Sequence, residues 1–196
     1  MENTKKAVVL ALLALACVAL ALGQTQKTAA PQKGNPVVAL QTTMGTIKVQ
    51  LFADKAPITT RNFLDYVNSG FYNGTLVHRV DFVIGFGGYT EALTAKPTRP
   101  AIKNESKNGL KNLKGTLAMA RYDDPNSATS QFFINLKDNT HLDPSAGGFG
   151  YAVFGKVIEG MEVVDSIAKV KTGNKGPFSN IPLSIIVVES AKVVAR

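Results

Sequence analysis

The sequence contains few of the residue types on which most enzyme chemistry depends. It has no tryptophan, two histidines, His78 and His141, and a single cysteine, Cys17, in 196 residues. The histidines are far apart in the chain, and no His-Glu-x-x-His motif or His/Cys cluster occurs, so we expect neither a metal nor another cofactor. The sequence also lacks a Gly-x-Ser-x-Gly elbow and a glycine-rich loop that ends in Gly-Lys-Ser/Thr. These absences argue against metal-dependent, nucleotide-dependent and covalent catalysis.

Positive charge exceeds negative charge, but it is not concentrated anywhere in the sequence. The chain has 22 Lys and Arg against 14 Asp and Glu, which gives a formal net charge of +8. A nucleic-acid-binding surface usually shows an arginine-rich stripe or a basic ladder interleaved with aromatic residues, and the sequence has neither. We therefore expect a solvated basic surface and no nucleic-acid partner.

The first residues have the pattern of an export signal. Lys5 and Lys6 precede an unbroken apolar run at residues 7–22, and Ala21 and Gly23 supply the small residues of a signal-peptidase site. The run is short for a membrane span, which needs about 20 residues. An uncleaved single-span anchor is the alternative interpretation. Cleavage predicts a periplasmic or secreted protein without cysteine and without stable membrane association.

The rest of the chain is expected to form one domain. Residues 1–23 are assigned to the signal peptide, residues 24–35 to a linker rich in Gln, Thr, Lys, Ala and Pro, and residues 36–196 to the domain. About 160 residues are enough to bury a hydrophobic core without disulfides. We expect this domain to be a monomer.

Most of the domain has the sequence pattern of short strands. Residues 37–41 and 46–51 flank a Thr-Met-Gly turn and predict a hairpin. Residues 57–68 predict a helix, because the apolar residues recur at a spacing near 3.6 and a proline occupies the first turn. Residues 160–170 predict a second helix. Further strands are predicted at 75–80, 82–86, 116–120, 131–136, 152–157 and 185–194. About eight strands and two helices indicate an antiparallel barrel capped by helices, and a β-sandwich fits the pattern nearly as well.

Three pairs of segments carry a more specific signal. They are Val77-His78-Arg79-Val80 with Phe82-Val83-Ile84, Gly115–Arg121 with Ser127–Asn135, and His141-Leu142-Asp143 with Phe149–Val157. Together they resemble the cyclophilin family, and most closely the exported cyclophilins of Gram-negative bacteria. The resemblance covers about residues 37–194 in the family's order. It implies a mainly β fold, a closed eight-stranded antiparallel β-barrel capped by two α-helices, and peptidyl-prolyl cis-trans isomerase activity on proline-containing polypeptides.

The resemblance also implies a set of site residues. Arg79 matches the family's catalytic arginine, and Gln131 matches a glutamine that binds the substrate backbone. Ala120 and Arg121 match the strand that pairs with the peptide. The wall of the proline pocket is matched by Phe82, Val83, Phe133 and Leu142. His141 falls where many relatives carry tryptophan or phenylalanine, and Tyr151 falls where others carry histidine.

An arginine is chemically suited to this reaction. Rotation about a peptide bond costs roughly 18–20 kcal/mol because resonance is lost in the twisted state. No covalent bond has to break, so stabilising the twisted state is sufficient. A guanidinium, which is always charged, interacts with the lone pair that the proline nitrogen gains on twisting. Arg79 is therefore the predicted catalytic residue.

The sequence departs from the family close to that arginine. Relatives usually have Ile-Pro-Gly where this chain has only Asp81, and a glutamine where it has Gly85 or, with the gap placed differently, Phe86. Two functions stay open at this stage: an isomerase that assists folding of exported proteins, and a proline-peptide binding module or chaperone with weakened or lost catalysis. A ligand-carrying barrel is a third, which requires an apolar interior cavity.

Overall fold

The computed structural model describes residues 34–195. The predicted signal peptide and the linker up to residue 33 lie outside this range. Within residues 34–195, no helix has the length and apolar character needed to span a bilayer.

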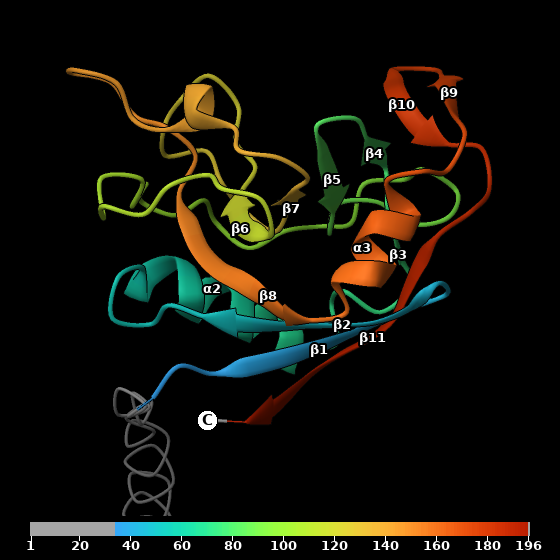
Figure 1. Cartoon of the computed structure of the whole chain (residues 1–196), viewed down its shortest axis with the longest axis horizontal. Coiled ribbons are helices and arrows are strands. Elements are labelled where there is room, and N and C mark those ends of the chain that lie inside the picture. Colours follow the sequence, from blue (N-terminus) through green and yellow to red (C-terminus); the bar gives the residue numbers. More distant parts are fainter. Residues whose placement is uncertain (1–33, 196) are drawn as a thin grey trace, which may run out of the picture. The chain divides into compact units, whose positions relative to one another are not determined.

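A curled antiparallel sheet of nine strands dominates the described domain (Figure 1). The strands of this sheet are β1 (Val37–Thr42), β2 (Gly45–Leu51), β3 (Thr75–Leu76), β4 (Arg79–Val80), β5 (Val83–Phe86), β6 (Thr116–Met119), β7 (Phe132–Asn135), β8 (Val153–Glu159) and β11 (Val187–Ala195). Their order across the sheet is β3-β11-β1-β2-β8-β6-β7-β5-β4. The mainly β class and the predicted β1–β2 hairpin are confirmed. The predicted closed eight-stranded barrel is not confirmed, because this order is an open sheet of nine strands with β3 and β4 at its two edges.

The two end strands are neighbours in the chain. Only Val77 and His78 separate β3 from β4, so the predicted strand at residues 75–80 is present but interrupted. The Val77 N–H donates to the Ile186 carbonyl at 2.9 Å, on the β11 side, and the His78 N–H donates to the Gly85 carbonyl at 3.0 Å, on the β5 side. The interruption therefore lies where the segment changes partners.

Helix α2 (Pro57–Asn68) begins and ends where the sequence predicts. Pro57 lies in its first turn, where a missing N–H costs nothing. The Glu105 carboxylate, from a distant loop, accepts hydrogen bonds from the N–H groups of Ile58 at 3.1 Å and Thr59 at 2.8 Å. This carboxylate satisfies two of the unpaired amides at the helix N-terminus.

Helix α3 (Met161–Ile167) is shorter than predicted, and a glycine fixes its start. Gly160 has a φ of 86°, and a Cβ at this position would lie 2.2 Å from the Thr46 carbonyl oxygen. No other residue fits this close approach to β2, so the chain enters α3 through a glycine.

Aromatic side chains fill the inside of the curled sheet. Phe86 and Phe132 stack with their ring centroids 5.2 Å apart, and Phe63 of α2 meets Phe132 edge to face at 5.1 Å. All three are buried. A ligand-carrying barrel needs space at this position, so this packing argues against that function.

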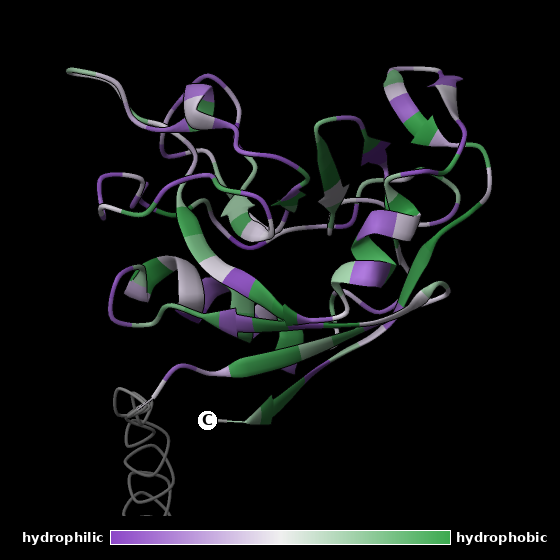
Figure 2. Ribbon diagram, viewed as in Figure 1, coloured by the Kyte–Doolittle hydropathy of each residue, from purple (hydrophilic) through white to green (hydrophobic). Residues whose placement is uncertain are grey.

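A second hairpin, β9 (Thr172–Lys175) with β10 (Phe178–Pro182), was not predicted. Figure 2 shows long hydrophobic stretches in β1 and β11, whereas β9 is neutral to hydrophilic. The β9 residues are half-buried or exposed, so they have no apolar alternation from which a strand could be predicted.

Candidate active site

A second apolar cluster lies outside the core. Its buried members are Val83, Ala118, Phe133 and Val153, and the half-buried side chains around them are Phe52, Phe82, Leu110, Ala120, Leu142 and Tyr151. We call these ten residues the outer cluster. It brings together six of the predicted site residues from five separate parts of the chain. An apolar surface patch of this kind can receive a proline ring.

The pleat of β5 and β7 separates the outer cluster from the core. Successive residues of a strand face opposite sides of a sheet. Phe132 belongs to the core and Phe133 to the outer cluster, as predicted for this adjacent pair. Phe133 is only 6% exposed, and its ring meets that of Tyr151 at 5.6 Å. Phe133 thus forms the floor of the outer cluster and Tyr151 part of its wall.

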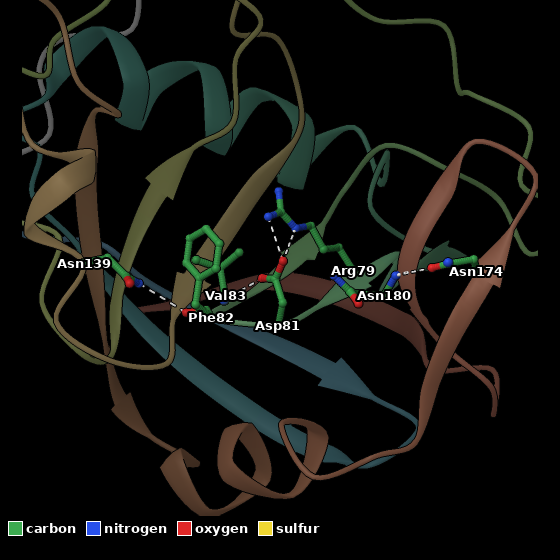
Figure 3. Close-up of polar contacts among 7 residues, drawn as sticks. All are labelled: Arg79, Asp81, Phe82, Val83, Asn139, Asn174 and Asn180. Carbon is green, nitrogen blue, oxygen red and sulfur yellow. Dashed lines mark hydrogen bonds and ion pairs between the residues drawn. The ribbon is translucent and has the colours of Figure 1, made fainter.

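Arg79 lies beside this cluster at the start of β4. Its side chain is 46% exposed, and its guanidinium carbon lies 5.2 Å from the centre of the Phe82 ring. The Nε and Nη2 groups contact Asp81 Oδ2 at 2.8 and 2.7 Å (Figure 3). Arg79 is therefore held over the edge of the apolar patch by one carboxylate and one aromatic ring.

Asp81 was not predicted as a site residue. Asp81 is the residue that replaces the longer turn of the relatives, and its spacing of two from Arg79 is the only signal that could have indicated the pair. Its second oxygen, Oδ1, accepts a hydrogen bond from the Val83 N–H at 3.1 Å. The carboxylate consequently connects Arg79 to the first residue of β5, a buried member of the outer cluster.

The register of β5 decides which residue replaces the family glutamine. Gly85 pairs with Arg79 on one side and with Phe133 on the other, whereas Phe86 is fully buried in the core. Gly85 therefore occupies the site-facing position. A Cβ there would lie 3.1 Å from His78 Nε2 and 3.3 Å from the Arg79 Cβ. His78 and Arg79 therefore occupy the space that a larger side chain at position 85 would need.

Phe82 is fixed from its other side. The Asn139 amide donates to the Phe82 carbonyl at 3.2 Å and to Asn135 Oδ1 at 2.8 Å, and Asn139 is fully buried. The exposed ring of His141 meets the Phe82 ring at 5.5 Å. Leu142 completes this side from a short 3-10 helix, Thr140–Leu142. His141 and Leu142 thus lie beside Phe82 on this side of the outer cluster.

Arg121 has a structural task in addition to its predicted contact with the peptide. It donates to the carbonyls of Phe149 at 3.0 Å, Gly150 at 3.2 Å and Tyr122 at 2.8 Å, and its guanidinium lies 4.9 Å from the Tyr151 ring centre. Its side chain therefore braces the loop that carries Tyr151.

Gln131 and Ala120 form the remaining edge of the site. The Ala120 N–H donates to the Gln131 carbonyl at 3.0 Å, and a Cβ at Gly88 would lie 2.7 Å from Gln131 Cγ. The Gln131 side chain therefore rests on Gly88, next to the strand that contains Gly85.

His78 precedes Arg79, and its ring lies between Gly85 and Tyr89. Its ring meets Tyr89 at 5.1 Å, and burial lowers the pKa of the imidazole from 6.5 to about 4, with the charge of Arg79 acting in the same direction. A neutral, packed histidine is a structural residue rather than a proton carrier.

The lowered pKa of His78 predicts a pH dependence of stability. The unfolded state takes up the proton near pH 6.5 and the folded state only near pH 4, so stability is complete above pH 6.5 and falls as the pH drops through this range. We expect the free energy of unfolding to decrease by about 2 kcal/mol between pH 7.5 and 5.0. Urea unfolding at both values measures this. In His78→Gln the decrease should largely disappear, and an unchanged decrease would contradict the assignment.

The sequence predicts no metal site. Among residues 34–195, no group of three or more His, Cys, Asp or Glu side chains is arranged to hold a metal ion. The site consists of an apolar patch, the Arg79–Asp81 ion pair on its Phe82 side and the Arg121 guanidinium on its Tyr151 side.

Comparisons with known proteins agree with this geometry. Residues 37–193 match the family model described as cyclophilin type peptidyl-prolyl cis-trans isomerase/CLD. Peptidyl-prolyl cis-trans isomerase A of Dickeya dadantii is 52% identical over 161 residues, which cover 81% of this chain and 85% of that protein. Peptidyl-prolyl cis-trans isomerase B of Escherichia coli is 48% identical over 162 residues, which cover 80% and 99%.

A solved structure has a similar fold. It is the cyclophilin type peptidyl-prolyl cis-trans isomerase of Cryptosporidium parvum, crystallised in the presence of the dipeptide Ala-Pro. It superimposes with a TM-score of 0.71 at 27% identity and covers 82% of this chain and 99% of that one. The present chain therefore belongs to the cyclophilin-type peptidyl-prolyl cis-trans isomerase family. This confirms the family and the enzyme class predicted from the sequence.

Proposed function

We propose that this protein accelerates rotation about X-Pro bonds with Arg79 as the catalytic residue and the outer cluster as the proline pocket. The observation that carries the proposal is the position of the Arg79 guanidinium, which lies 5.2 Å from the Phe82 ring at the edge of a patch floored by Phe133. If a proline ring packs on Phe133, the nitrogen of that proline can face Arg79. The solved relative crystallised with Ala-Pro supports a ligand of this chemistry.

The mechanism needs no proton transfer and no covalent intermediate. The apolar walls hold the proline ring while the preceding residue rotates. When the amide twists, the nitrogen loses conjugation and becomes a hydrogen-bond acceptor. The guanidinium then gains an interaction that the planar ground state does not offer, and this difference lowers the barrier. The apolar surroundings exclude water and strengthen the interaction.

An assay of bond rotation tests the proposal. Exchange NMR on a short Ala-Pro peptide, with the domain added in catalytic amounts, should show faster cis-trans interconversion at an unchanged equilibrium ratio. A folded protein that binds the peptide and leaves the exchange rate unchanged would contradict catalysis and support the second candidate, a proline-peptide binding module. The observation that favours this second candidate is Gly85, which offers no side chain at the position of the family glutamine.

The sheet is proposed to close as an eight-stranded barrel. If β3 and β4 are counted as the two halves of one interrupted strand, the ring contains that strand, β11, β1, β2, β8, β6, β7 and β5. The hydrogen bonds that Val77 makes to β11 and His78 makes to β5 support this count. Slow amide exchange at both positions would agree with closure, whereas fast exchange would indicate an open seam.

We further propose that the protein is exported, is cleaved near residue 23 and acts as a monomer on exported polypeptides, without stable membrane association. The basic residues, apolar run and small-residue site at the N-terminus support this. Cell fractionation and N-terminal sequencing of the purified protein test it. A membrane-bound protein that retains residues 1–23 would contradict cleavage, and a larger species in analytical ultracentrifugation would contradict the monomer.

A further inference from the structure

The turn between β4 and β5 holds the catalytic arginine through a single carboxylate. Asp81 Oδ2 accepts from Arg79 Nε at 2.8 Å and contacts Nη2 at 2.7 Å. We propose that Asp81 is a positioning residue for the isomerisation: it orients the Arg79 guanidinium toward the proline pocket. This inference rests on the proposed function of Arg79.

The carboxylate is itself firmly held. Asp81 Oδ1 accepts from the Val83 N–H at 3.1 Å, and the Asp81 N–H donates to the Val83 carbonyl at 3.0 Å. The Asp81 side chain is only 19% exposed, against 46% for Arg79. An exposed, long side chain is thus attached to a short, largely buried one, so the position of Arg79 is set by the backbone of the pocket wall.

This attachment leaves the outer edge of the guanidinium available. Arginine has five N–H groups in a rigid plane, and Asp81 uses one on Nε and one on Nη2. Both hydrogens on Nη1 and one on Nη2 remain for the substrate. The Phe82 ring, 5.2 Å from the guanidinium carbon, restricts the plane from a second direction.

No neighbouring group can replace Asp81 in this task. Gly85, which pairs with Arg79 across the strands, has no side chain. His78 points toward Tyr89 and is neutral above pH 4. Within residues 34–195, Asp81 is the only carboxylate paired with Arg79. Without it, the exposed arginine would sample many rotamers, and catalysis would lose its fixed geometry.

The replacement Asp81→Asn separates the two contacts of the carboxylate. An asparagine keeps an oxygen for the Val83 N–H and therefore keeps the turn. Its amide NH₂ takes the place of Oδ2 and cannot accept a hydrogen bond from Arg79. We expect kcat/KM for an Ala-Pro peptide to fall by about 10- to 100-fold, with thermal stability and peptide affinity close to those of the wild type.

The matched control is the ion pair between Asp65 and Arg99. These residues contact at 3.3 Å with side chains 45% and 50% exposed, away from the outer cluster. Asp65→Asn removes an Asp–Arg pair of the same chemistry and should leave kcat/KM unchanged. An NMR measurement independent of activity follows the Arg79 Nε–H signal, which should be protected from exchange in the wild type and in Asp65→Asn, and exposed in Asp81→Asn.

The outcomes are distinct. If the Nε–H signal becomes exposed while kcat/KM stays at or above the wild-type value, Asp81 does not position Arg79 for catalysis, and a rise in rate would show that its charge restrains the arginine. If Arg79→Ala retains full activity, the proposed role of Arg79 itself fails. If Asp81→Asn is slow but adding it to Arg79→Ala causes no further loss, the two residues act as one unit and the inference is supported.

Discussion

Replacing Arg79 with alanine is expected to lower kcat/KM for X-Pro isomerisation by about 100-fold or more, with little change in stability or peptide affinity. The Arg79 guanidinium lies at the Phe82 edge of the outer cluster, next to its partner Asp81, whereas the Arg121 guanidinium is hydrogen-bonded to backbone carbonyls on the Tyr151 side. The Arg79 side chain is also 46% exposed, so its loss removes little buried surface. Exchange NMR gives the rate, and titration with an Ala-Pro peptide gives the affinity.

The control for this prediction is Arg99→Ala. Arg99 is a half-exposed arginine with an aspartate partner, and its guanidinium carbon lies 5.7 Å from the Tyr66 ring centre, so it matches Arg79 in its contacts but not in its location. It should retain wild-type activity. Equal losses in both variants would mean that surface charge, rather than a positioned guanidinium, determines the rate, and would exclude Arg79 from the mechanism proposed above.

Phe132→Ala is expected to lower the stability of the domain and Phe133→Ala to weaken peptide binding, although the two residues are adjacent. Phe132 packs among the aromatic rings of the core, so its truncation should lower the free energy of unfolding by about 3–5 kcal/mol. Phe133 belongs to the outer cluster, the proposed proline pocket, so its truncation should weaken binding of an Ala-Pro peptide by about 10- to 100-fold. Urea unfolding and peptide titration on both variants measure the two quantities.

The conservative variants Phe132→Leu and Phe133→Leu keep most of the apolar volume and should have smaller effects of the same kind. The assignment of the two faces would be wrong if Phe133→Ala unfolded as easily as Phe132→Ala while binding the peptide normally. Comparable losses of both quantities in both variants would mean that the core and the pocket do not respond separately.

Local pattern predicted the elements whose apolar residues face one side. Helix α2 begins at Pro57 as expected, because proline fixes the first turn and the apolar spacing defines the buried face. The β1–β2 hairpin lies where it was predicted, with each strand one residue longer at the turn, because alternation and a turn signal coincide. The β9–β10 hairpin could not be predicted in this way, since its residues contribute little to the core and are held by pairing with each other.

Tertiary pairing determined the features of the site that the sequence left open. The sequence allowed either Gly85 or Phe86 at the position of the family glutamine. Only the pairing of β5 with β7, which sets Gly85 opposite Phe133, assigns Gly85 to the site face. The contact between Arg79 and Asp81 was hidden for a similar reason. The contact depends on the turn at Asp81, whose N–H and carboxylate are both hydrogen-bonded to the Val83 backbone.

The place of β11 in the sheet has a consequence for the life of the newly made chain. β11 is the last strand in the sequence, yet it lies between β1 and β3, and its residue Ala195 is paired with Val37 at the start of the domain. β1 therefore gains its second neighbour only after β11 has been synthesised, and the sheet cannot be completed earlier. Contacts between such distant residues form slowly. Pairing of β1 with β11 is therefore expected to be a late step of folding, which completes the sheet only after the last strand has been made.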